Sequence, residues 1–285
     1  MKKALLFVSA LLMLLGVGRA IKIAMDSDKT TIKWHRTVMD GSRTGVKSVT
    51  VDNVDTALGT FDDETYVAPS GVKFTGGATP EVAAALMEVQ PKMSALKQVI
   101  GYSKEEMAVA PPECKLSNMF VDEMRRYCST LFKKEMDFAL TNFGGIRCSM
   151  PEGAIVLDDI LSMFPFKNHL VYAAIKGKNL KSLFDQLALT ETFQCISGAR
   201  VAIKDHKVVS AEIGGKPIED EKVYNVASID FLLTGGDRIA LGAMAEEIAI
   251  SDVLLKDMML EYVQNLTAQG KQIEYFTDSR VTMEN

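Results

Sequence analysis

A short run at residues 142–147, Asn-Phe-Gly-Gly-Ile-Arg, combines residue types that could hold a polar ligand. It follows the apolar residues 138–141, so the pattern predicts a strand that ends in a tight loop. Gly144 and Gly145 have no Cβ, which lets the backbone approach a ligand closely. Arg147 carries a planar guanidinium that suits a phosphate or a carboxylate. The run therefore predicts a site for a small anionic molecule, and the alternative is an ordinary glycine turn with a surface arginine.

Two further loops carry residues that complement the first one. Residues 164–166, Phe-Pro-Phe, lie between a predicted helix at 157–163 and a predicted strand at 169–175. Residues 231–237 follow a predicted strand at 223–229. Together with the first run, these loops offer two aromatic faces, an amide, a guanidinium, a carboxylate and several glycines. The candidate ligand-binding residues are Asn142, Gly144, Gly145, Arg147, Phe166, Phe231, Gly235, Gly236 and Asp237.

A nucleoside monophosphate presents the groups that such a set could bind, namely an aromatic base, a diol and a phosphate. Stacking of a base on an aromatic side chain is worth about 1–3 kcal/mol and tolerates different bases. Asp237 could accept hydrogen bonds from ribose hydroxyls, Arg147 could meet the phosphate, and Asn142 could orient the part between them. In the alternative interpretation, Phe166 and Phe231 are core aromatics. Asp237 is then a turn residue, and Asn142 stabilises its own loop.

The N-terminus has the pattern of a cleavable export signal. Two lysines precede an apolar run at residues 4–17, and the small-x-small sequence Gly-Arg-Ala ends at Ala20. The apolar run is shorter than the roughly 20 residues that a membrane span needs, so a retained anchor is the weaker interpretation. We therefore expect residues 1–20 to be removed and the rest to be periplasmic or secreted, with no membrane span.

Composition and charge exclude some classes of function. A net charge of −5 over 285 residues argues against binding a nucleic-acid polymer, which needs clustered Lys and Arg. The three histidines are scattered, so the sequence predicts no metal site and no catalytic residue. The cysteines could form disulfides after export or remain as buried thiols, and the sequence does not choose between these. They are Cys114, Cys128, Cys148 and Cys195.

The order of patterns predicts an α/β fold with mixed sheets. Residues 21–75 are expected to form a strand-rich N-terminal extension, with strands at 30–34 and 46–51, and residues 76–285 the main domain. A connecting helix is expected at 79–100, and Pro91 is expected to kink or restart it. From 114 onward, predicted helices and strands alternate without a regular βαβ succession. The last helix is expected at 251–266, with Ser251 or Asp252 as its N-cap.

The segment from about Met93 to the C-terminus resembles the C-terminal, substrate-binding domain of the 5′-nucleotidases. The resemblance lies in residues 142–147, 164–166 and 231–237, in Lys176-Gly177 before a helix, and in residues 223–226. It implies a layered α/β/β/α fold with mixed sheets and outer helices. It further implies that the base lies between Phe166 and Phe231, that Asp237 binds the ribose, and that Asn142 and Arg147 also contact the ligand.

Two departures from that family shape the expected function. Full-length members carry a metallophosphatase domain with two metal ions, whereas this sequence shows no metal-ligand pattern. They also place a phosphate-binding arginine before the helix that begins near Ser117, but residues 108–112 contain no Arg or Lys. We therefore expect a nucleotide-binding subunit of an exported phosphohydrolase of nucleotide catabolism, acting on 5′-nucleotides or 2′,3′-cyclic nucleotides.

In this expectation, a separately encoded metallophosphatase chain supplies the catalytic domain and its divalent metal ions, of the Zn, Mn, Mg or Ca type. The ligand of the present chain is then a nucleoside or a nucleoside 5′-monophosphate. One alternative is a non-catalytic nucleoside- or nucleotide-binding protein of the periplasm. Another is a degenerate domain that is kept for interactions alone.

Overall fold

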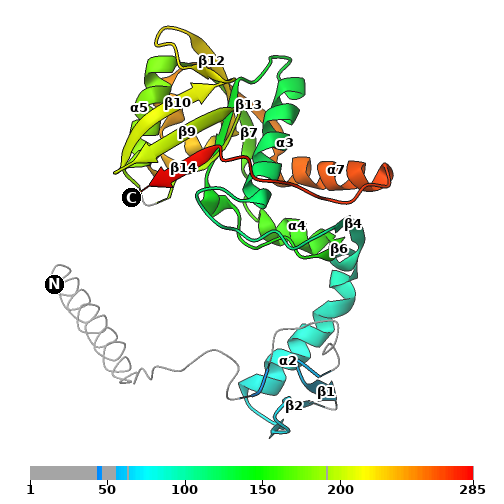
Figure 1. Ribbon diagram of the computed structural model, residues 1–285. Coiled ribbons are helices and arrows are strands. Elements are labelled where there is room, and N and C mark those ends of the chain that lie inside the picture. Colours follow the sequence, from blue (N-terminus) through cyan, green and yellow to red (C-terminus); the bar gives the residue numbers. More distant parts are fainter. Residues whose placement is uncertain (1–43, 47–55, 63, 191, 285) are drawn as a thin grey trace, which may run out of the picture. The chain divides into compact units, whose positions relative to one another are not determined.

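The structure is a computed structural model that describes residues 44–46, 56–62, 64–190 and 192–284. Contacts divide the chain into two compact units, one up to Glu88 and one from Val89 onward (Figure 1). The expected export signal and the strand expected at 30–34 lie outside the described residues, as does the strand expected at 46–51 except for its first residue. Within the described part, no helix is long and apolar enough to cross a membrane.

The first unit contains a small antiparallel sheet and a helix. The sheet has the order β1-β2-β3, formed by Thr60–Asp62, Thr65–Val67 and Lys73–Phe74. Helix α2 spans Ala78–Val89, with Pro80 and Glu81 in its first turn. Proline tolerates this position because the first helical N–H groups have no partner within the helix.

The connecting helix expected at 79–100 is shorter than predicted. It ends at Val89 and continues as 3₁₀ turns over Gln90–Lys97 (η1), in which Pro91 occupies the first turn. Strand β4 then spans Val99–Ser103 and pairs antiparallel with β6, Gly153–Val156. The apolar residue Ile100 thus belongs to a strand, where it is buried. The spacing of apolar residues in this segment suggests a helix, but pairing with β6 makes it a strand.

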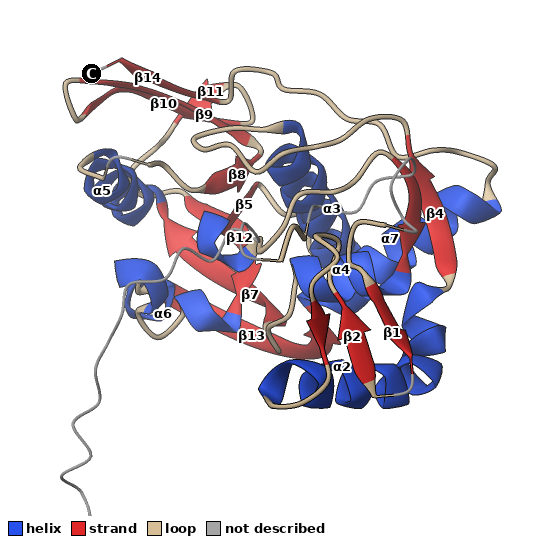
Figure 2. Cartoon of the chain, turned by 90° about the horizontal axis from the view of Figure 1, so that it is seen from below, coloured by secondary structure: helices blue, strands red, loops and turns tan. Residues whose placement is uncertain are grey.

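A five-stranded mixed sheet forms the centre of the second unit, with the order β13-β7-β12-β5-β8 (Figure 2). The strands are β5 (Phe138–Thr141), β7 (His169–Lys176), β8 (Cys195–Ser197), β12 (Val223–Ile229) and β13 (Ala245–Leu254). Strand β12 is parallel to β5 and antiparallel to β7. Its apolar residues from Tyr224 onward are buried, because helices cover the sheet, whereas Val223 at its start is exposed.

Helices and a second sheet surround this centre. Helix α3 (Lys115–Leu131) packs on β5, β8 and β12, and α7 (Leu255–Ala268) packs on α3 and β4. Helix α5 (Gly177–Ala188) contacts β7 and also the four-stranded sheet β11-β10-β9-β14. That sheet comprises Lys216–Pro217, Lys207–Ile213, Ala199–Lys204 and Val281–Glu284. Short helices α4 (Leu157–Met163) and α6 (Leu241–Met244) complete the unit. The predicted α/β class with mixed sheets and outer helices is confirmed.

The N-terminus expected for the last helix is wrong. Residues 251 and 252 belong to β13, and α7 begins only at Leu255, with Leu254 as its N-cap residue. Strand β13 pairs antiparallel with β7, and the Ser251 hydroxyl donates to the Leu170 carbonyl at 2.9 Å. The serine therefore serves a strand contact and does not cap a helix.

The cysteines are free thiols in the structure. Cys114, Cys128 and Cys195 are buried, and Cys148 is half-buried. Burial raises the pKa of Cys128 to about 12 and that of Cys195 well above its usual value. Such thiols are poor nucleophiles, because the thiolate is the reactive form.

A buried arginine fixes the C-terminal segment to helix α3. Arg280 directs Nη1 and Nη2 at the Asp122 carboxylate, at 2.7 and 3.0 Å, and its Nε donates to Asp278 at 2.8 Å. Its Nη1 also donates to the Ile196 carbonyl. Partial burial acts to raise the pKa of Asp278, but Arg280 and Arg200 outweigh it and hold that pKa below its usual value. The network places β14 beside β9.

Replacing Arg280 by Met should destabilise the fold, because Asp122 and Asp278 lose their shared partner. Breaking a fully buried pair costs roughly 3–5 kcal/mol, and since both carboxylates keep some contact with water we expect about 2–3 kcal/mol. Urea unfolding measures this change. The matched control is Arg200→Met, an exposed arginine beside Asp278, which should cost under about 1 kcal/mol. Equal losses for the two variants would contradict the assigned role of Arg280.

Candidate functional site

The three predicted loops meet at one pocket of about 230 Å³. Every predicted residue except Gly235 and Gly236 lines it. The lining residues are Asn142, Gly144, Gly145, Arg147, Phe166, Asn168, Phe231 and Asp237. The loops are separated in sequence, so the fold has to bring them together.

Strand pairing explains why these loops share one edge of the central sheet. Strands β5 and β12 are parallel neighbours, so the loops after them, at 142–147 and 230–237, leave the sheet on the same side. Strand β7 is antiparallel to β12, and Leu170 at its start pairs with Ile229 at the end of β12. The segment before β7, which carries Phe166, therefore arrives at the same edge.

A hydrogen bond between Asn142 and Asp237 joins the first and third loops. The Asn142 side chain is buried, and its Nδ2 donates to Asp237 Oδ2 at 2.6 Å. Asn142 thus bonds across to another loop and not to its own, in contrast to the Asx-turn alternative. A Cβ built on Gly144 or Gly145 would lie 3.3 Å from the Asn142 amide group, so glycine leaves the space that this amide needs.

The other end of the Asn142 amide has no hydrogen-bond partner among the residues that the structure describes. Its Oδ1 is buried, and no donor in the described part of the chain bonds to it. A buried acceptor without a hydrogen bond costs roughly 1–3 kcal/mol. Because this atom belongs to a residue that lines the pocket, a ligand that donates a hydrogen bond there would relieve that cost.

The two predicted stacking residues are not core residues. Phe166 and Phe231 are 45% and 42% exposed, and both line the pocket. Phe164, two residues before Phe166, is the buried member of that segment, and its ring lies 5.3 Å from that of Phe120. The Phe-Pro-Phe sequence therefore directs one ring into the core and leaves the other at the surface.

The two glycines outside the lining shape the third loop. Gly235 has a φ of 104°, a conformation that favours glycine. A Cβ on Gly236 would lie 2.5 Å from a ring carbon of Phe231, which is closer than any real contact. Gly236 thus permits the Phe231 ring to fold back over its own loop. Asp237 follows with φ 50°, also in the left-handed region.

Arg147 lies exposed at the rim of the pocket. Its Nη1 donates to the Gly144 carbonyl at 3.2 Å, and its Cζ is 5.9 Å from the centre of the Phe166 ring. That distance is at the limit of a cation–π contact. Among the described residues, no carboxylate lies within 4 Å of this guanidinium, so its charge is available to an anion.

Sequence reasoning missed polar residues next to the predicted ones. Asn168 lines the pocket, and its neighbour His169 places Nδ1 3.0 Å from Asp230 Oδ2. Asp230 precedes Phe231, so this contact links the second and third loops. Gln194 accepts a hydrogen bond from the backbone N–H of Phe143 at 2.9 Å. The available signal was the position of Asn168 and His169 at the start of a strand that follows Phe166.

The described residues do not form a metal site. No three His, Cys, Asp or Glu side chains among them are grouped closely enough to hold a metal ion. The described residues that line the pocket offer hydrogen-bonding groups, two aromatic rings and one guanidinium without a carboxylate partner among the described residues.

Comparisons with known proteins identify the family to which this domain belongs. The sequence model described as "5′-nucleotidase, C-terminal domain" matches residues 99–244. Protein UshA of Yersinia enterocolitica is 37% identical over 108 residues, which are 35% of this chain and 19% of that protein. Protein UshA of Escherichia coli is 35% identical over 108 residues, which are again 35% of this chain and 19% of that protein. The chain thus matches about a fifth of the length of these relatives.

A solved structure shows the same fold. The 5′-nucleotidase precursor from Thermus thermophilus superposes with a TM-score of 0.63 and 25% identity, over 79% of this chain and 48% of that one. The family match covers the β5, β7 and β12 strands and all three loops that line the pocket. By its C-terminal domain, this chain belongs to the 5′-nucleotidase family.

Proposed function

We propose that the pocket between Asn142 and Asp237 binds a nucleoside 5′-monophosphate. The observation that carries this proposal is that two half-exposed phenylalanine rings, an uncommitted arginine and a buried amide with a free acceptor line one cavity. Few other small molecules combine a planar aromatic ring, hydroxyl donors and an anion in one body. The family to which the chain belongs supports a nucleotide-related role.

Each part of the nucleotide has a counterpart in the pocket. The base would stack on the rings of Phe166 and Phe231, which offer apolar surface to any base. Asp237 would accept hydrogen bonds from the ribose hydroxyls, and Asn142 Oδ1 would accept one from a ligand donor. Arg147 would meet the phosphate through its planar donor fork. Gly144 and Gly145 would allow close approach of the ligand to the backbone.

The small volume of the pocket favours a role in holding part of a substrate in place over one in enclosing the whole molecule. At about 230 Å³ it is smaller than the roughly 300–1,000 Å³ of complete small-molecule sites. It would therefore enclose the nucleoside part and leave the phosphate at the rim beside Arg147. Holding a reactive group in place for another centre is itself a major component of catalysis.

In the proposal, a separate metallophosphatase chain provides the catalytic centre of an exported phosphohydrolase of nucleotide catabolism. Divalent metal ions would be held by that partner, because the described residues do not fit a metal pair. The chain matches about a fifth of the UshA proteins, which supports the view that further parts are required. Export is supported by the residue pattern of positions 1–20.

A second candidate is a nucleoside- or nucleotide-binding protein without a catalytic partner. The observation in its favour is that the stacking rings, Asn142 and Asp237 all come from this one chain, so nucleoside binding needs no second protein. A pull-down from the periplasm separates the candidates, since only the first requires a phosphatase partner.

Phe166→Ala and Phe231→Ala should weaken adenosine binding while leaving the fold intact. Loss of one stacking surface should cost about 1–3 kcal/mol of binding free energy, measured by calorimetry. The free energy of unfolding should change by less than about 1 kcal/mol, because both rings are partly in water. Phe164→Ala is the matched control and should instead cost about 3–5 kcal/mol of stability. Unchanged affinity in both pocket variants would refute stacking.

The purified chain should hydrolyse AMP no faster than buffer, even with Mn²⁺ or Zn²⁺ added. The reason is that its pocket supplies binding groups and no metal-activated water. Release of inorganic phosphate measures this directly. Turnover that disappears in Arg147→Ala would overturn the division of labour between two chains, because it would place catalysis in this chain.

A further inference from the structure

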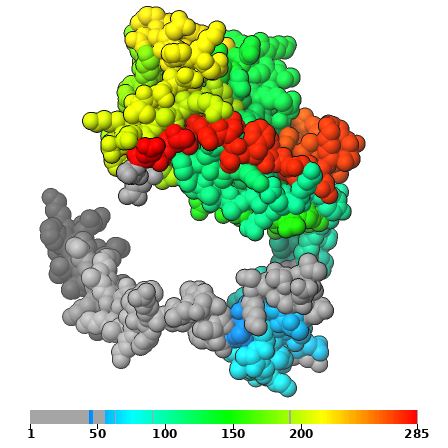
Figure 3. Space-filling model, viewed as in Figure 1, coloured from blue at the N-terminus to red at the C-terminus, as the bar shows by residue number. Residues whose placement is uncertain are grey.

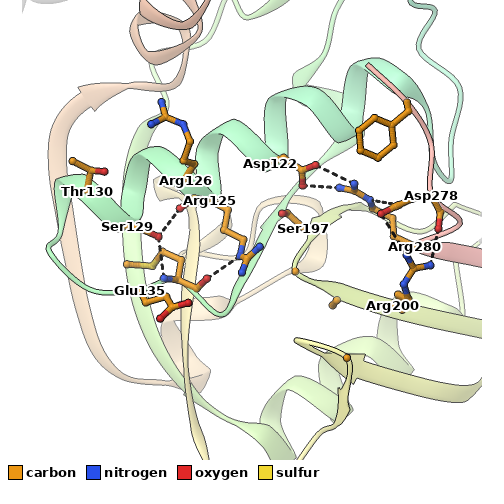
Figure 4. A pocket seen from close by; sticks show the side chains of 15 residues that line it. Asp122, Arg125, Arg126, Ser129, Thr130, Glu135, Ser197, Arg200, Asp278 and Arg280 are labelled. Atoms are coloured by element: carbon orange, nitrogen blue, oxygen red, sulfur yellow. Dashed lines mark hydrogen bonds and ion pairs between the residues drawn. The ribbon is translucent and has the colours of Figure 1, made fainter. Parts of the chain in front are cut away.

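A second cavity, of about 640 Å³, lies at the opposite end of strand β5 from the nucleotide pocket (Figure 4). Met136, just before β5, lines this cavity, whereas Asn142, just after β5, lines the nucleotide pocket. Helix α3 forms one wall, and residues 197–200 and 276–280 contribute to the others. The volume falls within the roughly 300–1,000 Å³ that is usual for small-molecule sites.

Most of the arginines that line this cavity are committed to protein partners. Arg280 is bound by Asp122 and Asp278. Arg126 donates from Nε to Glu123 at 2.8 Å. Arg200 donates to the Asp278 carbonyl at 2.6 Å and has the Asp278 carboxylate at 3.6 Å. These three guanidinium groups therefore have their charge matched within the fold.

Arg125 differs from the other three. Its Nε donates to the Met136 carbonyl at 2.8 Å, which anchors the side chain. No carboxylate of the described residues lies within 4 Å of its guanidinium, and no hydrogen bond to a described residue engages its terminal nitrogens. Figure 4 shows this side chain leaving α3 close to Ser197. Arg125 thus presents two free donors from a fixed position.

A glycine provides the space for this guanidinium. Gly198 has a φ of 78°, which favours glycine. A Cβ at Gly198 would lie 2.9 Å from Arg125 Nε and 3.1 Å from its Cζ, and 2.3 Å from the Asp137 carbonyl oxygen. The turn between β8 and β9 therefore holds the arginine where a larger residue would displace it.

The rest of the lining offers a hydroxyl and an apolar surface. Ser197 lines the cavity beside Arg125, and its hydroxyl can donate to an oxygen of a ligand. Phe276 also lines it, 57% exposed, with its ring stacked on Tyr275 at 5.1 Å. The Ser129 hydroxyl is already used, because it donates to the Arg125 carbonyl and accepts from the Met136 N–H.

We propose that this cavity binds the carboxylate of a small organic acid, with its two oxygens on the terminal nitrogens of Arg125. Paired donors in a planar fork match the geometry of a carboxylate. Only one of the four arginines is left without a carboxylate, and Glu135 adds a negative charge at the edge of the cavity. One free cation matches a singly charged carboxylate better than a doubly charged phosphate. This site is independent of the proposed nucleotide pocket.

Titration of the whole chain with benzoate at constant ionic strength tests the proposal. Benzoate offers a carboxylate for Arg125 and an apolar ring for the apolar part of the lining, whereas benzamide has the same shape without the charge. We expect saturable binding of benzoate, at least tenfold weaker binding of benzamide, and weaker binding of phenyl phosphate. Backbone amide NMR signals of Met136 and Gly198 should shift, and those of Gly144 and Asp237 should not.

Variants locate the bound carboxylate. Arg125→Gln should weaken benzoate binding at least tenfold, and Arg125→Lys, which keeps the charge but loses the planar fork, should also weaken it. Arg126→Gln, on the same helix, and Arg147→Gln, in the nucleotide pocket, should leave it unchanged within about twofold. The Lys variant keeps the test decisive if the Gln variant does not fold.

Several results would overturn the proposal. They are the absence of saturable binding, equal binding of benzamide, tighter binding of phenyl phosphate, and loss of binding in Arg147→Gln with retention in Arg125→Lys. None of these results depends on nucleotide binding, so failure here leaves the proposal for the other pocket untouched.

Discussion

The pairing of β12 with its two neighbours is the constraint on which the candidate site depends. Val226 pairs with Phe138 of β5 in parallel, and Ile229 pairs with Leu170 of β7 in antiparallel. This register brings the ends of three distant segments to one edge of the sheet, as seen in Figure 2. A one-residue slip would turn every side chain of a strand to the other face, so the buried sheet fixes the register firmly. In the space-filling view, residues of β9, β10 and β14 cover part of the visible face of the second unit (Figure 3).

At that edge, the fold holds polar side chains in place but leaves some of their hydrogen-bonding atoms without a partner among the described residues. Asn142 is tied to Asp237 through its amide nitrogen, while its oxygen has no partner among the described residues. Phe166 keeps a large exposed face although Phe164, two positions away, is in the core. Free hydrogen-bonding capacity and exposed aromatic surface both cost stability in the absence of a ligand. Their occurrence together in one pocket is therefore better explained by binding than by folding.

The sequence predicted those helices and strands whose conformation is determined by the residues within them. The strands at 138–141 and 223–229 and the helix at 157–163 have the predicted bounds, and the loops after those strands carry the pocket residues. The prediction failed where a distant strand decides the conformation. Ile100 is expected at the end of a helix but belongs to β4, a strand that pairs with β6. Ser251 is expected to cap a helix but belongs to β13. Arg125 gave no signal, because its environment depends on a tertiary contact with Gly198, which lies far from it in sequence, as well as on Met136, 11 residues away.

The structure of the chain bound to adenosine 5′-monophosphate tests the central claim most directly. The account predicts the base against Phe166 and Phe231, the ribose hydroxyls on Asp237, and the phosphate at the rim beside Arg147. It also predicts a donor of the ligand on Asn142 Oδ1, the buried acceptor that has no partner in the described chain. A nucleotide bound elsewhere, or one bound in this pocket with its base away from both rings, would contradict the account.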